Sequence, residues 1–155
     1  ASIMLHDMLR RILRNMDLSE NEIDESIYDA MLLSVDVAHA LHPNKKEKMD
    51  ITNKPVMGKG FCIKQACSQS YATDAQAIAI LCQLCDEKGI PYQRFVNRSD
   101  SRGGSTLGSI AGTLLPVKTV DIGIPILAMH SACELMGVRD MKALSDCVTA
   151  FFGYH

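Results

Sequence analysis

The pattern of hydrophobic and polar positions predicts an amphipathic helix at the start of the chain and a buried strand soon after it. Apolar residues recur at helical spacing over Met4–Leu13, and this helix is expected to end near Met16. Asp17–Glu25 is polar and is expected to be a loop. Met31–Ala38 is an apolar run that suits a buried strand, although its composition would also suit a helix.

The rest of the chain alternates between strand and helix patterns. A capping-box pattern at Thr73–Gln76 predicts a helix that runs to Lys88 and stops at Gly89. The other expected elements are a surface loop over Pro43–Gly60, strands over Phe61–Ala66, Tyr92–Asn97 and Lys118–Ile124 (the last closed by Pro125), a helix from the Gly103–Gly108 turn to near Leu115, a short helix or turn at Ser131–Glu134, and a last helix over Asp140–Phe151. This alternation predicts an α/β fold, a three-layer sandwich with a mostly parallel mixed sheet, formed by residues 1–155 as one unit.

Composition narrows the class of protein. The 155 residues are enough for one hydrophobic core, and 47% hydrophobic with 22% charged residues is typical of a soluble globular domain. The net charge is -2, and acidic residues interrupt the lysine cluster Lys45–Lys48, so no nucleic-acid partner is expected. The chain has no apolar stretch of the ~18 residues that a membrane span needs, and its start lacks the apolar core of a secretory signal.

Cysteine usage indicates a reducing compartment. A core of this size needs no disulfides, so the six cysteines are expected to be free thiols in a cytoplasmic protein. Cys82 and Cys85 form a C-x-x-C pair, but they lie inside a helical pattern and no second pair follows at zinc-finger spacing. We interpret both as small buried hydrophobic residues.

Candidate chemistry begins where the first predicted strand ends. Asp36 is a carboxylate in an apolar run, and burying it is costly unless a metal, a histidine or backbone amides satisfy it. His39 and His42 follow at a spacing of three, which on a helical turn would place both on one face and suit a metal. Pro43, however, favours an extended conformation at His42. From the residues alone, His39 is best interpreted as a structural histidine.

Three further segments carry possible site residues, each with a structural alternative. His130 follows an apolar strand and is either a core histidine or a ligand. Gly103–Gly108 is a glycine-rich turn with two hydroxyls before a helix, which is either an anion- or carbonyl-binding nest or a simple turn and cap. It is no P-loop, because no Gly-Lys-Ser/Thr follows. Lys64 lies in a predicted strand, where a lysine is ordinarily solvated.

Four segments of the chain resemble the aspartyl aminopeptidases, dinuclear-zinc exopeptidases that remove N-terminal residues from peptides. They are Ser34–Asn44, Gly60–Lys64 with Ser70–Ala75, Val96–Gly108, and Val120–Ser131. The resemblance implies that Asp36 and His130 are zinc ligands. It also implies that His42 contacts the substrate or the reacting carbonyl, where an imidazole would stabilise a developing oxyanion.

The same resemblance assigns substrate contacts. It implies that Gly104, Ser105 and Thr106 belong to a loop that lines the active site, and that Lys64 meets the acidic side chain of the substrate's N-terminal residue. A lysine ammonium is a suitable partner for such a carboxylate. Two positions depart from the family pattern: Ser109 stands where the family often has proline, and the neighbours of Lys64 differ.

The resemblance extends from about Ser26 to Phe151 and covers the C-terminal part of a family member. The family's other zinc ligands and its general-base glutamate precede that part, and the residues before Asp36 do not replace them. We therefore expect the C-terminal portion of a zinc-exopeptidase catalytic domain, inactive by itself. A complete site would hold two Zn²⁺ ions, with Mn²⁺ or Co²⁺ as alternatives, and act on peptides within a homo-oligomer. The alternative is a non-catalytic α/β remnant that self-associates or binds a partner.

Overall fold

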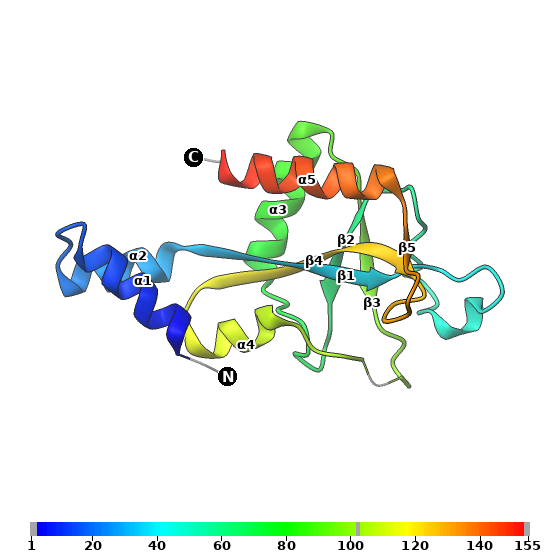
Figure 1. Cartoon of the computed structure of the whole chain (residues 1–155), viewed down its shortest axis with the longest axis horizontal. Helices are drawn as coiled ribbons and strands as arrows, with labels where there is room; N and C mark the ends of the chain where they lie inside the picture. The colour runs from blue at the N-terminus through cyan, green and yellow to red at the C-terminus, as the bar shows by residue number, and fades with distance from the viewer. Residues whose placement is uncertain (1–2, 102, 154–155) are drawn as a thin grey trace.

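A mixed sheet with helices on both faces forms the centre of the molecule. The structure, a computed structural model, describes residues 3–101 and 103–153, so residue 102 of the Val96–Gly108 segment lies outside it. Within the described residues the sheet has five strands in the order β1-β4-β2-β3, with β5 paired to β4 (Figure 1). The strands are β1 (Met31–His39), β2 (Phe61–Gln65), β3 (Tyr92–Val96), β4 (Lys118–Leu127) and β5 (Leu135–Met136). Pairing is parallel for β1 with β4 and for β2 with β3, and antiparallel for β2 with β4 and for β4 with β5.

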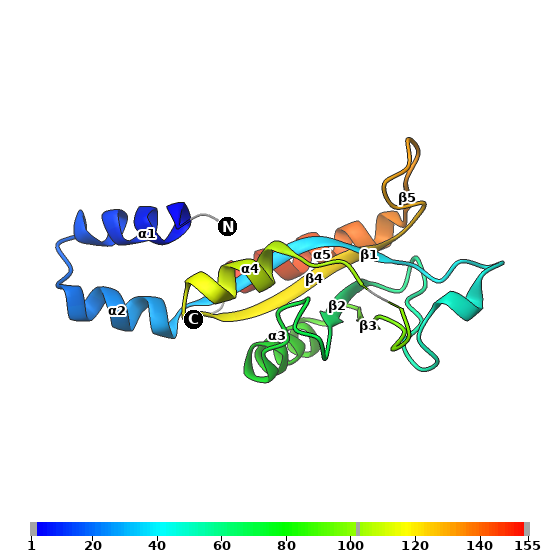
Figure 2. The same cartoon turned by 90° about the horizontal axis from the view of Figure 1, so that it is seen from below.

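Alternate residues of β4 face opposite helical layers. The helices are α1 (Met4–Arg14), α2 (Glu20–Asp29), α3 (Ala75–Lys88), α4 (Leu107–Leu114) and α5 (Val138–Phe152), with a short 3-10 helix at Lys46–Lys48. Val120, Ile122 and Ile124 pack with α3 and α5 in one hydrophobic core. Asp121 faces α4 on the other side, where a Cβ added to Gly108 would lie 2.7 Å from its Oδ1. Figure 2 shows α4 alongside β1 and β4. The three-layer α/β sandwich predicted from the sequence is therefore confirmed. No helix in the described part of the chain is long and apolar enough to cross a membrane.

Helices α1 and α2 form a hairpin at one end of the sheet (Figures 1 and 2). The loop predicted over Asp17–Glu25 is wrong, because α2 begins inside it. The Ser19 side chain caps the Glu22 N–H while the Glu22 carboxylate accepts from the Ser19 N–H, a full capping box. Ile23 and Ile27, four residues apart, then bury one face of the helix. Both signals are present in the sequence, in a segment whose polar surface otherwise favours a loop.

Two element boundaries differ from the prediction, the end of β4 and the start of α5, and hydrogen bonds explain both. Strand β4 does not close at Pro125 but continues to Leu127. The carbonyl of Ile126 accepts from the Ala40 N–H, so the Pro125 nitrogen, one residue earlier, faces away from β1. On that other side the pairing with β2 has already ended at Gly123, and the missing N–H therefore removes no ladder hydrogen bond.

The last helix begins at Val138 rather than at Asp140, and Asp140 lies in its first turn. This fully buried carboxylate accepts hydrogen bonds from the N–H groups of Gly58 (2.6 Å) and Gly60 (2.8 Å). Gly60 has φ +102, and a Cβ there would lie 2.1 Å from the Pro91 carbonyl oxygen. Helix α5 thus fixes the end of the predicted Pro43–Gly60 loop at a position that only glycine can occupy.

Candidate metal and substrate site

A pocket of about 240 Å³ lies near the carboxyl ends of the parallel strands β1 and β4. Six residues that the sequence singled out line it, and they come from segments far apart in the chain: Asp36, His39, Lys64, Gly104, Ser105 and His130. Ligand sites in open α/β sheets favour this edge, because loops after neighbouring strands converge there. The topology therefore brings candidate metal ligands and candidate substrate contacts into one cavity.

Asp36 and Lys64 project from the same face of the sheet and form an ion pair. The Lys64 Nζ lies 3.3 Å from Asp36 Oδ2 and donates to the Val37 carbonyl oxygen at 2.9 Å. Lys64 is only 3% exposed, so the sequence-based interpretation as a solvated strand lysine is wrong. The Asp36 side chain is 49% exposed, which leaves much of its carboxylate open to the pocket.

Two aromatic rings complete the surroundings of Lys64. The Lys64 Nζ lies 4.6 Å from the centroid of the Tyr71 ring, a cation–π contact. Tyr71 and Phe95 both line the pocket, and their rings contact each other at a tilted angle. Sequence reasoning assigned neither ring a role. The available signal was the position of Tyr71 in the Ser70–Ala75 segment of the family pattern, next to a strand lysine.

His39, interpreted from the sequence as structural, lies at the end of β1 and lines two pockets. Partial desolvation of the ring lowers the pKa of His39 below its ordinary value, and the positive charge of Lys64 adds to this effect. His39 is therefore held toward its neutral form beside the Asp36 and Lys64 pair.

His42 lies outside the pocket that holds Asp36. It lines a larger neighbouring cavity of about 710 Å³ that shares His39 with the first pocket. The His42 Nδ1 accepts the Asn44 N–H at 3.1 Å, which leaves Nε2 as the proton-bearing nitrogen of a neutral ring. The structure thus places His42 one cavity away from the candidate metal ligands.

Thr106 does not line the 240 Å³ pocket either, but it lines a neighbouring cavity of about 490 Å³ together with Asp36 and Ser105. It is 5% exposed, and its hydroxyl donates to Asp121 Oδ2 at 2.6 Å. The same Asp121 oxygen accepts the Ala72 N–H at 2.5 Å, while Asp121 Oδ1 is buried and has no hydrogen-bond partner among the described residues. Asp121 therefore joins the loop before α4 to the segment before α3, and both segments line the pocket, the first through Gly104 and Ser105 and the second through Tyr71. The hydrogen bond from Thr106 to Asp121 therefore anchors the loop that carries Gly104 and Ser105.

The turn after β4 that presents His130 contains unusual backbone. Ala128 has φ +56 and His130 has φ +69, both in the left-handed region. The Ser131–Glu134 capping-box pattern predicts that the Glu134 carboxylate accepts the Ser131 N–H. In the structure, Glu134 Oε1 accepts the His130 N–H instead, one residue earlier. Left-handed conformations of residues other than glycine are costly and concentrate at functional sites.

The residues of the pocket fit part of a zinc shell. A half-exposed carboxylate (Asp36) and an exposed imidazole (His130) are both ordinary zinc ligands. Within residues 3–101 and 103–153, however, no cluster of three or more His, Cys, Asp or Glu side chains is arranged to hold a metal ion. The described residues therefore supply two candidate ligands, fewer than the three protein ligands of a catalytic zinc site.

The family model for the aminopeptidase I zinc metalloproteases (M18) matches residues 1–152, so the chain belongs to this family. Among curated relatives, a probable M18 family aminopeptidase 2 of Clostridium novyi (strain NT) is 47% identical over 139 residues, which are 90% of this chain and 32% of the relative. Its counterpart in Clostridium acetobutylicum is 44% identical over 97% of this chain and 35% of the relative. The chain thus spans about a third of the length of these relatives.

Solved structures share the fold. In the cryo-EM structure of the Ape4 and Nbr1 complex, one chain matches 97% of this chain with a TM-score of 0.92 at 34% identity, over 29% of its own length. The Saccharomyces cerevisiae mApe1 dodecamer matches 80% of this chain with a TM-score of 0.69 at 28% identity, over 27% of its own length. The M18 aminopeptidase of Thermotoga maritima, at 23% identity, covers 93% of this chain and 34% of its own with a TM-score of 0.81. The same arrangement of layers therefore exists within chains about three times as long.

Proposed function

We propose that residues 1–155 act as the C-terminal portion of the catalytic domain of a zinc-dependent aminopeptidase, in the cytoplasm. Asp36 and His130 are its metal ligands in this proposal. The observation that supports it is the convergence of both side chains on one pocket in a chain of the M18 family. Asp36 keeps its bond to Lys64 through one oxygen, and its exposed side offers the other to a metal.

The chemistry follows from what these side chains present to a peptide. Bound Zn²⁺, two ions in a complete site, or Mn²⁺ or Co²⁺ in their place, would activate water and polarise the scissile carbonyl. Ser105 and the backbone at Gly104 bind and orient the peptide within the pocket. Thr106 serves this loop through its hydrogen bond to Asp121. His42, in the adjoining cavity, donates from Nε2 to the reacting carbonyl or to the substrate.

In this proposal the enzyme prefers peptides with an acidic N-terminal residue, and Lys64 is the reason. An ammonium group has three N–H donors, and the contacts to Asp36 and Val37 use two of them. The third can meet a substrate carboxylate within the pocket. Because Lys64 is buried, that contact would be desolvated and correspondingly selective.

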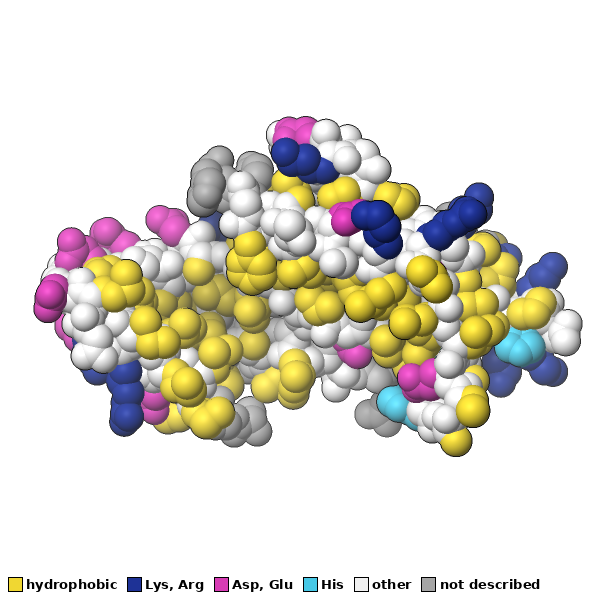
Figure 3. All heavy atoms as spheres, turned by 45° about the horizontal axis from the view of Figure 1, so that its top comes forward, with side chains coloured by type: hydrophobic (Ala, Val, Ile, Leu, Met, Phe, Trp, Pro, Cys, Tyr) yellow, Lys and Arg dark blue, Asp and Glu magenta, His cyan; other side chains and the backbone are white. Residues whose placement is uncertain are grey.

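The proposal includes a homo-oligomer. A band of hydrophobic side chains runs along the face of the molecule seen in Figure 3. Large exposed apolar residues are frequent on α1, among them Met4, Leu5, Met8 and Ile12. Exposed apolar surface of this extent is typical of association sites. The related mApe1 protein is a dodecamer, which supports self-association in this family.

A chimera tests the proposal. The matching 139-residue segment of the Clostridium novyi relative is replaced by this chain's residues, after the relative's own hydrolysis of aminoacyl-p-nitroanilides has been measured. The chimera should show zinc-dependent turnover, and Asp36→Asn and His130→Ala should each abolish it. Full activity of either variant would remove that residue from the metal site. An inactive chimera that folds and assembles like the relative would instead favour a non-catalytic α/β remnant.

A further inference from the structure

Two buried cysteines from different helices lie against each other on the face of the sheet away from the candidate site. Cys85 of α3 and Cys147 of α5 are both 0% exposed, and their Sγ atoms are 3.9 Å apart. They are 62 residues apart in the chain, so their proximity is a product of the fold. The core that surrounds them includes Ala77, Leu81 and Leu144.

We propose that Cys85 and Cys147 form a reversible disulfide bond that fastens α3 to α5 when the chain meets hydrogen peroxide. A disulfide is about 2.05 Å long, so the sulfurs must approach by nearly 2 Å. Rotation about the two Cα–Cβ bonds and a small shift of α5 can supply this approach. Helix α5 is the last element of the described chain, ending at Phe152, and it packs on the sheet through one side only.

The two thiols differ in reactivity because of their contact. The Cys85 thiol donates its hydrogen bond to Cys147, which lowers the pKa of Cys147 and raises that of Cys85. Cys147 is therefore the attacking thiolate. Its sulfur bonds to one peroxide oxygen and the O–O bond breaks, which gives a sulfenic acid and water. Cys85 then attacks the sulfenic sulfur, the S–S bond forms, and a second water leaves. Two thiols are oxidised and one peroxide is reduced to two waters.

The other cysteines differ in exposure and are expected to react differently with peroxide. Cys67 and Cys133 are exposed and are expected to react first, giving bonds between molecules. Cys62 is buried, and burial raises its pKa to about 12, which suppresses its thiolate. Cys82 lies one turn before Cys85 on α3 and is partly exposed, so it is the matched control for a chance reaction on this helix.

The test uses the full chain with Cys67→Ser and Cys133→Ser, so that bonds between molecules do not form. After one equivalent of H₂O₂, the monomer should lose about 2 Da, and non-reducing peptide mapping should join the Cys85 and Cys147 peptides. The melting temperature should rise by roughly 5–15 °C and return after dithiothreitol, because the bond closes a long loop. Adding Cys82→Ser should change none of this, whereas Cys85→Ser or Cys147→Ser should prevent the mass loss.

Three results would overturn the proposal. One is a disulfide bond whose sulfur atoms include that of Cys82 or Cys62, assigned by fragmentation of the linked peptide. Another is conversion of Cys147 to sulfinic or sulfonic acid without a disulfide. The third is no reaction of Cys85 and Cys147 at a peroxide dose that fully oxidises Cys67 and Cys133 in the wild-type chain. Peptide mapping detects all three on a chain that keeps Cys85 and Cys147, so the test holds even where the serine variants at these two positions fold poorly.

Discussion

Lys64 and Asp36, 28 residues apart in the chain, form a 3.3 Å ion pair in which the lysine is buried and the carboxylate is half exposed. One side of the pair is enclosed by protein, and the other side is open to the pocket. On the closed side, the Lys64 ammonium is also bound by the Val37 carbonyl and covered by the Tyr71 ring. On the open side, the carboxylate faces the pocket that His130 also lines. Lys64 therefore neutralises Asp36 without blocking it.

Replacing Lys64 tests selectivity in the active chimera. Lys64→Met should lower kcat/KM for N-terminal Asp and Glu at least about tenfold more than for neutral residues, since truncating one partner of a desolvated charge pair costs ~2–5 kcal/mol. Lys59→Met, at an exposed lysine before β2, is the control and should change neither. Equal losses on acidic and neutral substrates would make Lys64 a support for Asp36 and remove it from the specificity pocket.

The purified 155-residue chain should hydrolyse no aminoacyl substrate at a measurable rate, with Zn²⁺, Mn²⁺ or Co²⁺ added. Its described residues bring two candidate ligands together, and water activation and carbonyl polarisation need a fuller shell and a general base. A discontinuous assay with Asp-p-nitroanilide and a chelator control measures this. Robust turnover that the chelator abolishes would contradict the two-ligand interpretation.

Two glycines of α4 make a matched pair for stability. A Cβ on Gly108 would lie 2.7 Å from both Asp121 Oδ1 and Ser34 Cβ, so Gly108→Ala should lower the free energy of unfolding by ~1–3 kcal/mol. At Gly112 the nearest atom is Thr119 Oγ1 at 3.9 Å, so Gly112→Ala should raise stability by up to ~1 kcal/mol. Urea denaturation measures both. Equal effects would mean that α4 is free to move away from the sheet.

Thr106 is expected to act on stability more than on substrate binding. Thr106→Val keeps the shape and removes the hydrogen bond to Asp121, which should cost ~1.5–3 kcal/mol because the acceptor is a buried carboxylate. Thr113→Val on the exposed side of α4 is the control and should stay within ~0.5 kcal/mol. A Thr106 variant of unchanged stability that raises KM in the chimera would return Thr106 to the substrate contacts.

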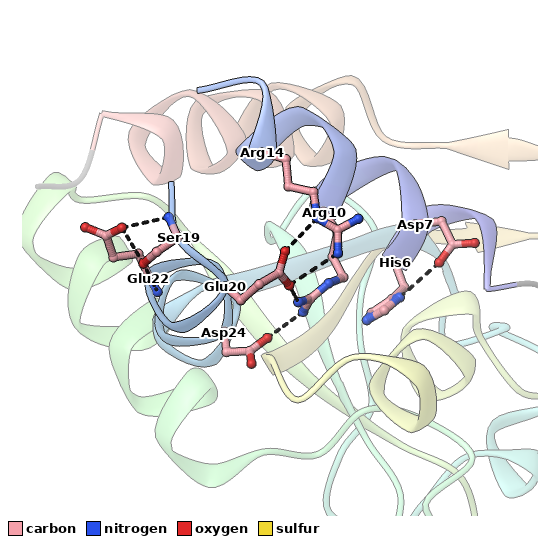
Figure 4. A network of polar contacts seen from close by, with 8 residues as sticks. All are labelled: His6, Asp7, Arg10, Arg14, Ser19, Glu20, Glu22 and Asp24. Atoms are coloured by element: carbon pink, nitrogen blue, oxygen red, sulfur yellow. Dashed lines mark hydrogen bonds and ion pairs between the residues drawn. The ribbon is translucent and has the colours of Figure 1, made fainter. Parts of the chain in front are cut away.

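Acid should weaken the hairpin of α1 and α2. Arg10 and Arg14 both bind Glu20, and Arg10 also binds Asp24 (Figure 4). The hydrogen bonds from Arg14 and Arg10 lower the pKa of Glu20 to about 2 from 4.5. A lowered folded-state pKa gives stability that is present above pH 4.5 and is lost as the pH falls toward about 2.

The measurement compares wild type with Glu20→Gln, and with Glu25→Gln on the same helix as the control. The loss of unfolding free energy caused by Glu20→Gln should be present at neutral pH and shrink as the pH falls through this window. High salt should reduce it, because these side chains are exposed. A loss that is independent of pH and salt would assign Glu20 a packing role only.

The sequence predicts the fold well where one signal dominates and less well where two compete. Met31–Ala38 is a strand as predicted, and the alternation of elements gives the three layers. The predicted burial of this strand is wrong, because β1 lies at the edge of the sheet and its residues other than Ala38 are half-buried or exposed. At Asp17–Glu25, the polar composition favours a loop, whereas the Ser19–Glu22 capping box, which starts α2 in the structure, favours a helix. Whether Pro125 ends strand β4 depends on which neighbouring strand its nitrogen faces. That depends on the order of strands in the sheet, which the local sequence does not determine.

The candidate site divides in the same way. Residue types and motifs point to Asp36 and His130, and their convergence follows from parallel strands ending at one edge. The position of Lys64 was beyond the sequence, because its burial against Asp36 depends on the register of β2 with β4. Thr106 was assigned to the wall of the site by its motif, whereas its hydroxyl binds Asp121, a residue that the motif analysis did not single out.

The glycine opposite Asp36 has a consequence for how this family can vary. Asp36 pairs in register with Gly123, where a Cβ would lie 2.7 Å from the Val37 carbonyl carbon. Because side chains alternate along a strand, inserting or deleting one residue in β1 would turn Asp36 to the opposite layer and place a different residue against Gly123. Homologous chains that keep an aspartate at the position of Asp36 should therefore differ in length within the loops and keep the spacing from Asp36 to His39 unchanged. Alignment gaps that fall inside this strand would mark proteins in which the carboxylate no longer reaches the pocket.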